Sequence, residues 1–263
     1  MAEIVGRDLS DSRFERVDLS RTRFRSIDLA GTRFHDVNLY RAVLRAAWLV
    51  EVDITGEIRD LTINGVDVGP LVEAELDRRD PERVLMRPTD PDGFRRAWDV
   101  VEHRWEETVA RARELAPEQL HVSVDGEWSF TETLRHLLFA TDAWVGRAVL
   151  GDPAPWHPLD LPWDELSDGP GVPRDRAARP SLEEVLALRR ERMATVRRVL
   201  DELTPARLEE STTPVDGPGW PPAEAYPVRE CLLTVLNEEW EHRRYAERDL
   251  AVLERGGPAP ADG

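Results

Sequence analysis

VRECLLTVLNEEWEHRRYAERDL, residues 228–250, is the stretch that decides how the second half of the chain folds. Its apolar residues recur every three or four positions, which predicts one buried face of a helix. These residues are Val228, Cys231, Leu232 and Val235, and later Ala246 and Leu250. Between them, the same spacing leads to Glu238 or Glu239 and then to His242. Because a buried carboxylate is costly unless it is paired or binds a metal, we expect a polar site on this face.

A second predicted helix, residues 130–150, offers a partner for that site. It begins with the capping-box pattern of Ser129 and Glu132, and His136 lies near its apolar stripe. Glu238 and His242 are four residues apart, so their side chains meet on one helix face. Together with His136 they make a set of two imidazoles and one carboxylate with an open position, which is typical of catalytic zinc.

The same residues allow a second interpretation that needs no metal. In it, Glu238 and Glu239 pair with nearby arginines on a solvated face, and His136 is a hydrogen-bonded core histidine. Those arginines are Arg243, Arg244 and Arg248. An acid and a histidine four residues apart are common on charged helices, so the residues alone leave both interpretations open.

The region 94–254 is expected to form one helical domain. Its four predicted helices cover residues 94–115, 130–150, 181–203 and 227–254. The loops 151–180 and 211–227 between them are long, and loops of this length are usually functional or disordered. Trp156, Trp163 and Trp220 predict ordered packing of these loops, which would suit a cover over a pocket mouth.

The N-terminal region repeats an apolar residue every five positions, a period that fits neither the 3.6 of a helix nor the 2 of a strand. The repeated residues are Ile4, Leu9, Phe14, Leu19, Phe24, Leu29, Phe34, Leu39, Leu44, Leu49 and Ile54. Residues 57–93 predict connecting strands, turned at Asn64-Gly65, and a short helix started by Pro70. We expect residues 255–263 to be a disordered tail.

The motifs VDLSR, IDLAG and VNLYR, at residues 17–21, 27–31 and 37–41, resemble the pentapeptide-repeat family. The resemblance implies a short right-handed quadrilateral β-helix over residues 1–56, in which residues twenty apart stack, such as Leu9 on Leu29 on Leu49. Some members of that family mimic DNA and bind gyrase. Residues 1–55 hold nine arginines and nine acids, and this neutrality makes a gyrase-binding role the weakest hypothesis. A structural or interaction appendage is favoured.

Residues 126–151 and 228–253 resemble the DinB/YfiT-like superfamily of four-helix bundles, and the likeness covers about 94–254. It is carried by W-S-x-x-x-x-L-x-H at residues 128–136 and by (H/E)-x-x-x-H at residues 238–242. The usual triad of that superfamily is three histidines. Glu238 at the first position of the second motif is similar to the mycothiol-dependent maleylpyruvate isomerase branch. The resemblance implies His136, Glu238 and His242 as ligands of a divalent metal, with zinc favoured over nickel, iron or manganese.

The resemblance also implies a function, that of a metal-dependent transferase or isomerase that acts on a small molecule. A low-molecular-weight thiol of the mycothiol type is the implied cofactor, and a homodimer is the implied assembly. Trp144, Trp240 and His157 are the candidate substrate contacts, and Glu239 and Trp240 flank the predicted ligands. The alternative from another class is a non-catalytic metal-binding or stress-associated interaction protein.

The composition of the chain narrows the classes of protein to which it can belong. The chain has 263 residues and a net charge of −17, so it lacks the basic surface that nucleic-acid phosphates require. It has no apolar run of about 18 residues, so we expect no transmembrane helix. It has one cysteine and no N-terminal apolar signal region. Together these features favour a cytoplasmic protein.

Overall fold

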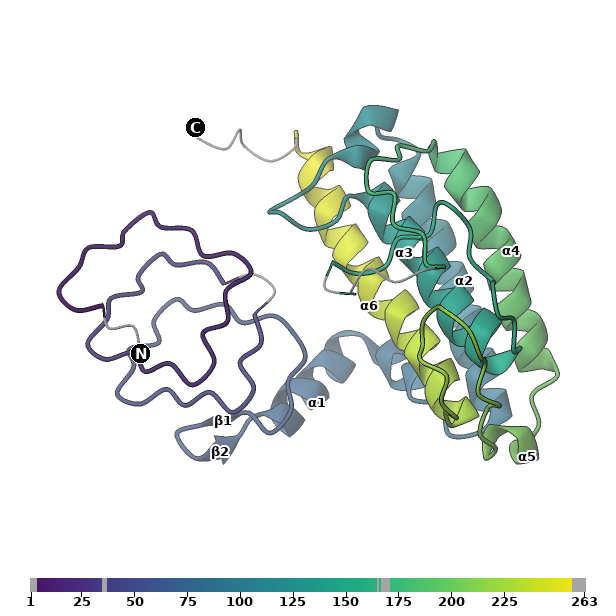
Figure 1. Cartoon of the computed structure of the whole chain (residues 1–263), viewed down its shortest axis with the longest axis horizontal. Helices are drawn as coiled ribbons and strands as arrows, with labels where there is room; N and C mark the ends of the chain where they lie inside the picture. The colour runs from purple at the N-terminus through teal and green to yellow at the C-terminus, as the bar shows by residue number, and fades with distance from the viewer. Residues whose placement is uncertain (1–3, 35–36, 165, 167–170, 257–263) are drawn as a thin grey trace. The chain divides into compact units, whose positions relative to one another are not determined.

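The structure is a computed structural model that describes residues 4–34, 37–164, 166 and 171–256. The chain divides into two compact units, Met1–Glu57 and Ile58–Gly263, and each is considered by itself (Figure 1). Most of the tail predicted at 255–263 lies outside the described residues. In the described part of the chain, no helix combines the length and the hydropathy needed to cross a membrane.

The first unit turns with the five-residue period that the sequence predicts. Among the described residues, positive φ recurs with a period of five, at Gly6, Asp11, Arg16, Arg21, Ser26, Gly31, Arg41, Ala46, Glu51 and Gly56. Every ten residues an aspartate or asparagine side chain also accepts the N–H of the residue two positions later. These pairs are Asp8–Ser10, Asp18–Ser20, Asp28–Ala30 and Asn38–Tyr40. The aspartate or asparagine before the repeated leucine therefore initiates a turn, as short polar side chains do elsewhere.

The stacked interior expected for this unit is not seen. The structure assigns no strand to residues 4–34 and 37–57, and the repeated side chains remain about half exposed. Leu9, Leu29 and Leu49, which were expected to stack, are 47 %, 52 % and 53 % exposed. The turns form through hydrogen bonds within one coil, whereas strands need ladder hydrogen bonds between coils. The five-residue period of the sequence is thus present as turns, whereas the pairing of neighbouring coils into a β-helix stays a prediction.

The second unit begins with a hairpin and a short helix, as predicted. Strands β1 (Thr62–Ile63) and β2 (Val66–Asp67) are antiparallel. Asn64 and Gly65 between them have φ of 52° and 81°, the conformation that a two-residue hairpin turn requires. Helix α1 (Gly69–Arg79) follows, with Pro70 in its first turn, and a 3₁₀ helix, η1 (Pro81–Met86), leads into the helical region.

Four long helices make up most of the second unit. They are α2 (Pro91–Ala112), α3 (Phe130–Thr141), α4 (Leu182–Asp201) and α6 (Val228–Glu254). A π-helix, η3 (Asp142–Val149), continues α3, and the short helices η2 (Pro117–His121) and α5 (Pro205–Leu208) lie in the connections. Helices α2 and α3 each contact both α4 and α6, so the four long helices run side by side (Figure 1). The predicted helical region is confirmed.

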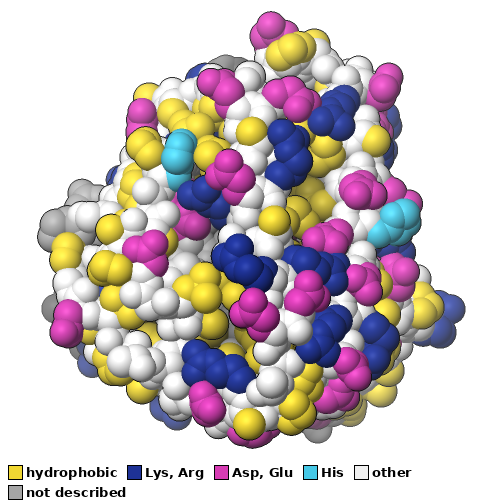
Figure 2. All heavy atoms as spheres, turned by 90° about the vertical axis from the view of Figure 1, so that its right-hand side faces the viewer, with side chains coloured by type: hydrophobic (Ala, Val, Ile, Leu, Met, Phe, Trp, Pro, Cys, Tyr) yellow, Lys and Arg dark blue, Asp and Glu magenta, His cyan; other side chains and the backbone are white. Residues whose placement is uncertain are grey.

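The core lies between these helices because each turns one apolar stripe inward. In α2 the stripe is Phe94, Trp98, Val101 and Trp105, all of which are buried. Arginine and carboxylate side chains alternate over the outside, and Figure 2 shows one face on which they are interspersed. Arg197 of α4, for example, pairs with Asp99 and Glu102 of α2. That face therefore presents no broad basic surface.

Both long loops are held to α3 and η3 by buried arginines. Arg135 donates to the carbonyls of Leu159, Asp175 and Ala178. Arg147 donates to the carbonyls of Pro153, Val215, Gly217 and Pro221. The loop tryptophans pack against other aromatic rings. Trp156 stacks on Phe139 at 5.4 Å, and Trp163 lies edge-on to Trp220 at 5.1 Å. The predicted ordered packing is confirmed for the described residues of these loops.

The capping box of α3 gives a first testable prediction. Glu132 accepts the N–H of Ser129 at 2.9 Å, and the hydroxyl of Ser129 accepts the N–H of Glu132 at 3.4 Å. We expect Ser129→Ala to lower the free energy of unfolding by about 1 kcal/mol, and the Tm by roughly 2–4 °C, in a thermal scan. Thr195→Ala, which removes a hydroxyl from the interior of α4, is the control and should change stability by less than about 0.5 kcal/mol.

Candidate metal centre

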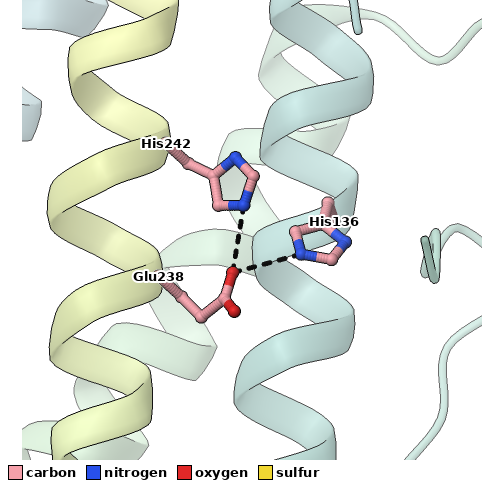
Figure 3. Close-up of side chains that lie close together, drawn as sticks. All are labelled: His136, Glu238 and His242. Atoms are coloured by element: carbon pink, nitrogen blue, oxygen red, sulfur yellow. Dashed lines mark hydrogen bonds and ion pairs between the residues drawn. The ribbon is translucent and has the colours of Figure 1, made fainter. Parts of the chain in front are cut away.

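Three side chains from α3 and α6 converge on one point (Figure 3). Oε2 of Glu238 lies 3.2 Å from Nε2 of His136 and 3.0 Å from Nε2 of His242. Each of the three residues offers one ligand atom, and these atoms lie within 4.8 Å of one another. Glu238 and His242 share a face of α6 because they are four residues apart, and α3 brings His136 to that face. The structure thus brings together the three residues that the sequence grouped.

The orientation of His136 is fixed by a loop carbonyl. Its Nδ1 lies 3.0 Å from the carbonyl oxygen of Leu161, and because a carbonyl only accepts, Nδ1 carries the proton. A neutral His136 then turns the lone pair of Nε2 towards the carboxylate of Glu238. Two acceptors 3.2 Å apart need a proton or a cation between them. Hydrogen bonding at the other ring nitrogen is also how proteins set the tautomer of a metal-binding histidine.

Burial and neighbouring charges set the protonation of the site. Full burial lowers the pKa of His136, in spite of the nearby carboxylate, and so favours the neutral imidazole. Burial opposes the ionisation of Glu238, but the neighbouring His136 and His242 outweigh that effect and hold the pKa of Glu238 well below its ordinary value. The result is an ionised carboxylate beside imidazole nitrogens, a donor set that fits a divalent transition metal.

The centre is covered on one side and open on the other. The side chain of His136 is only 7 % exposed, whereas those of His242 and Glu238 are 20 % and 28 % exposed. Glu238 and His242 can therefore be reached from solvent, which a catalytic metal site requires and a closed structural site does not.

Aromatic rings surround the two histidines. The ring of Trp128 lies 4.5 Å from that of His136 and stacks at 5.8 Å on that of His242. Phe139 lies 6.2 Å from His136, and Tyr245 lies 5.9 Å from His242. Sequence reasoning used Trp128 only as a mark of the W-S motif and missed its place at the site. Its position directly before the capping serine was the available signal, since the cap fixes where α3 begins.

The other predicted site residues make their contacts elsewhere. In the described part of the chain, no ring contact, hydrogen bond or ion pair joins Trp144, Trp240 or His157 to them. Trp144 packs edge-on against Tyr226, and Nδ1 of His157 accepts the N–H of Leu159. Trp240 is 2 % exposed in the hydrophobic core. The roles of Trp144, Trp240 and His157 in substrate binding stay predictions.

Glu239 does not flank the centre as expected. It is 1 % exposed and makes a bidentate ion pair with Arg189 of α4, at 2.5 and 2.7 Å. Successive helix residues are about 100° apart, so Glu238 turns towards α3 while Glu239 turns towards α4. The arginines proposed as partners instead pair with other acids, in the pairs Arg243–Glu247, Arg244–Glu241 and Arg248–Asp249. The solvated-face interpretation of the two glutamates is wrong.

Cys231 is a core residue, as the sequence suggested, and it gives a second prediction. It is fully buried, and burial raises the pKa of its thiol to about 11. Since only the thiolate reacts with alkylating agents, we expect no labelling of the native protein by iodoacetamide near pH 8. One equivalent should react once the chain is unfolded in denaturant. Rapid labelling of the native protein would contradict this placement of Cys231.

Comparison with known protein families agrees with this geometry. The family model of the DinB superfamily matches residues 100–246, which include all three central residues. The chain belongs to the DinB superfamily. A model of pentapeptide repeats matches in eight copies over residues 8–46 and 18–56, so both family resemblances drawn from the sequence are confirmed. Neither the curated proteins nor the solved structures include a significant match to this DinB-superfamily chain.

Proposed function

We propose that this DinB-superfamily chain is an enzyme that depends on a divalent metal held by His136, Glu238 and His242. The observation that carries the proposal is the convergence of three ligand atoms within 4.8 Å. In this proposal α2, α3, α4 and α6 form a four-helix bundle around the metal. The N-terminal repeats form a short right-handed quadrilateral β-helix that serves as an appendage.

The donor set favours zinc, with nickel, iron or manganese as alternatives. When bound, such a metal polarises a carbonyl, lowers the pKa of a bound water, or holds a thiol as thiolate. The chain's own residues would bind it through Nε2 of both histidines and the Glu238 carboxylate. The Leu161 carbonyl orients His136, and Trp128 excludes water from one side of the two imidazoles.

The proposed reaction is transfer to, or isomerisation of, a small molecule, with a low-molecular-weight thiol as cofactor. The rival function is non-catalytic metal binding. The partial exposure of Glu238 and His242 favours the enzyme, because a purely structural metal has no use for a solvent-facing position. A cytoplasmic location and a homodimer belong to the same proposal.

The test begins with the metal content of the purified full-length protein, for which about one equivalent of divalent metal per chain is expected. The metal is then exchanged for cobalt, and a low-molecular-weight thiol is titrated while the visible spectrum is recorded. A thiol-dependent change in the cobalt bands supports an open, catalytic position. A protein that takes up no stoichiometric metal contradicts the proposal. Cobalt bands that do not change when a thiol is added favour the rival function, in which the metal is structural.

A further inference from the structure

A buried pair of carboxyl groups lies outside the metal centre, where the loop 151–180 meets η3. Asp160 of the loop is 0 % exposed, and Asp142 at the start of η3 is 6 % exposed. Each of the two carboxyl groups lies close enough to affect the charge of the other. Two ionised carboxylates only accept hydrogen bonds and repel each other, so a buried pair that faces one guanidinium favours one proton on the pair.

The charges around the pair agree with this count. Arg192 of α4 donates two hydrogen bonds to Asp142, from Nε to Oδ1 at 3.1 Å and from Nη2 to Oδ2 at 2.9 Å. Asp160 accepts the N–H of His157 at Oδ2, at 3.0 Å. In the described residues its Oδ1 is buried and has no hydrogen-bond partner, which leaves this oxygen to carry the proton. One guanidinium thus faces two carboxyl groups.

Three further charged or titratable groups lie near the pair or its arginine, and none supplies a second free cation to Asp160. Glu191 of α4 contacts Arg192 at 3.3 Å and adds negative charge. Arg135 of α3 lies near Asp160, but its guanidinium is taken up by loop carbonyls. His157 accepts the N–H of Leu159 at Nδ1, so that nitrogen carries no proton and the ring is neutral.

The residue after Asp160 is the one that orients His136. Leu161 donates its N–H to the carbonyl of Arg135 at 3.2 Å, and its own carbonyl faces Nδ1 of His136 at 3.0 Å. On the other side, the carbonyl of Leu159 accepts from Nε of Arg135 at 2.8 Å. The segment 157–161 is therefore fastened to α3 on both sides of Asp160, and the carboxyl pair fastens it to η3.

We propose that Asp142 and Asp160 share one proton, and that this protonated pair is a latch that holds the Leu161 carbonyl against His136. Asp160 is thus a positioning residue. When the proton leaves to solvent, two negative charges face the single Arg192, and their repulsion releases the segment 157–161. The consequence for His136 rests on the proposed metal function, whereas the latch itself does not.

The pH dependence of the latch has a definite sign. Burial, and then the charge of Asp142, raise the pKa of Asp160 to about 8, against about 4 for an unfolded aspartate. Between these values the folded chain holds a proton that the unfolded chain has released. The stability contributed by the pair is therefore complete below about pH 4 and is lost as the pH rises towards 8.

The first experiment follows the Tm of the metal-free full chain from about pH 5 to pH 9 in the wild type, Asp160→Asn and Glu191→Gln. An asparagine still accepts the N–H of His157 and can donate to Asp142 without a titratable proton. We expect the Tm of the wild type to fall with rising pH relative to that of Asp160→Asn. Glu191→Gln, which removes a nearby charge but keeps the pair, should follow the wild type. Parallel profiles of the wild type and Asp160→Asn overturn the proposal.

The second experiment needs no variant to fold. The infrared spectrum of the metal-free wild type at about pH 6 should show the C=O stretch of a buried carboxylic acid, which disappears above pH 8 as hydrogen exchange at residues 157–161 accelerates beyond its intrinsic pH dependence. Absence of that band, or exchange at 157–161 that follows only the intrinsic dependence, overturns the latch. Because both readouts use metal-free protein, a failure of the proposed metal function leaves them unaffected and is recognised separately by metal analysis.

Discussion

Removal of either His136 or Glu238 is expected to abolish stoichiometric metal binding. In His136→Ala the buried ligand from α3 is lost, and in Glu238→Gln the carboxylate that approaches both imidazoles loses its charge. Loss of a group that only supports a ligand typically costs 10–100-fold in metal affinity, so loss of a ligand should exceed about 100-fold. Metal analysis after dialysis and competition titration with a chromogenic chelator measure this effect.

The matched control for these variants is Glu241→Gln. Glu241 lies on the same helix, three residues after Glu238, and pairs with Arg244 at 2.7 Å on a partly exposed surface. It should keep the metal content of the wild type. Added zinc should raise the Tm of the wild type and of this control, since a ligand of the folded state stabilises it, but not that of the two site variants. Wild-type metal content in His136→Ala would refute the assignment of that ligand.

Regular periodicity is what made most of the fold predictable. The apolar stripes placed α2, α4 and α6 within a few residues of their observed bounds, and the capping box placed the start of α3. The predicted helix 130–150 is continuous, but from Asp142 its hydrogen bonds follow a π-helix. That change has no sequence period of its own. At the N-terminus, local side chains set the turns. Contacts between coils depend on how closely residues twenty positions apart pack together, and a sequence pattern does not specify that packing.

The site was predictable where helical phase decided it and not where distant partners did. Phase and spacing grouped His136, Glu238 and His242, but phase left Glu238 and Glu239 as equal alternatives. The two glutamates differ in their partners, because Arg189, fifty residues away on α4, forms an ion pair with Glu239. The Leu161 carbonyl, which orients His136, belongs to the backbone of an irregular loop and so has no signature in residue types.

The ion pair of Glu239 and Arg189 leads to the second large effect. Both side chains are almost completely buried, with exposures of 1 % and 3 %, and the guanidinium also lies over Trp105 at 5.3 Å. Glu239→Gln leaves that guanidinium buried without a counter-charge, which costs about 3–5 kcal/mol. We therefore expect the Tm to fall by roughly 6–20 °C in calorimetry. Glu241→Gln breaks a partly exposed pair on the same helix and should cost less than about 1 kcal/mol.

A double replacement separates the stability of this ion pair from its role in orienting α6. In Glu239→Leu with Arg189→Met both charges are absent, so much of the lost stability should return, because a buried ion pair is often no better than apolar residues of similar size. Metal affinity is the decisive readout. If the ion pair fixes the rotation of α6, the stable double variant will bind metal more weakly than the wild type, since Glu238 and His242 lose their alignment with His136. Unchanged affinity would mean that apolar packing alone turns Glu238 towards α3, and that the charges at 189 and 239 only satisfy each other.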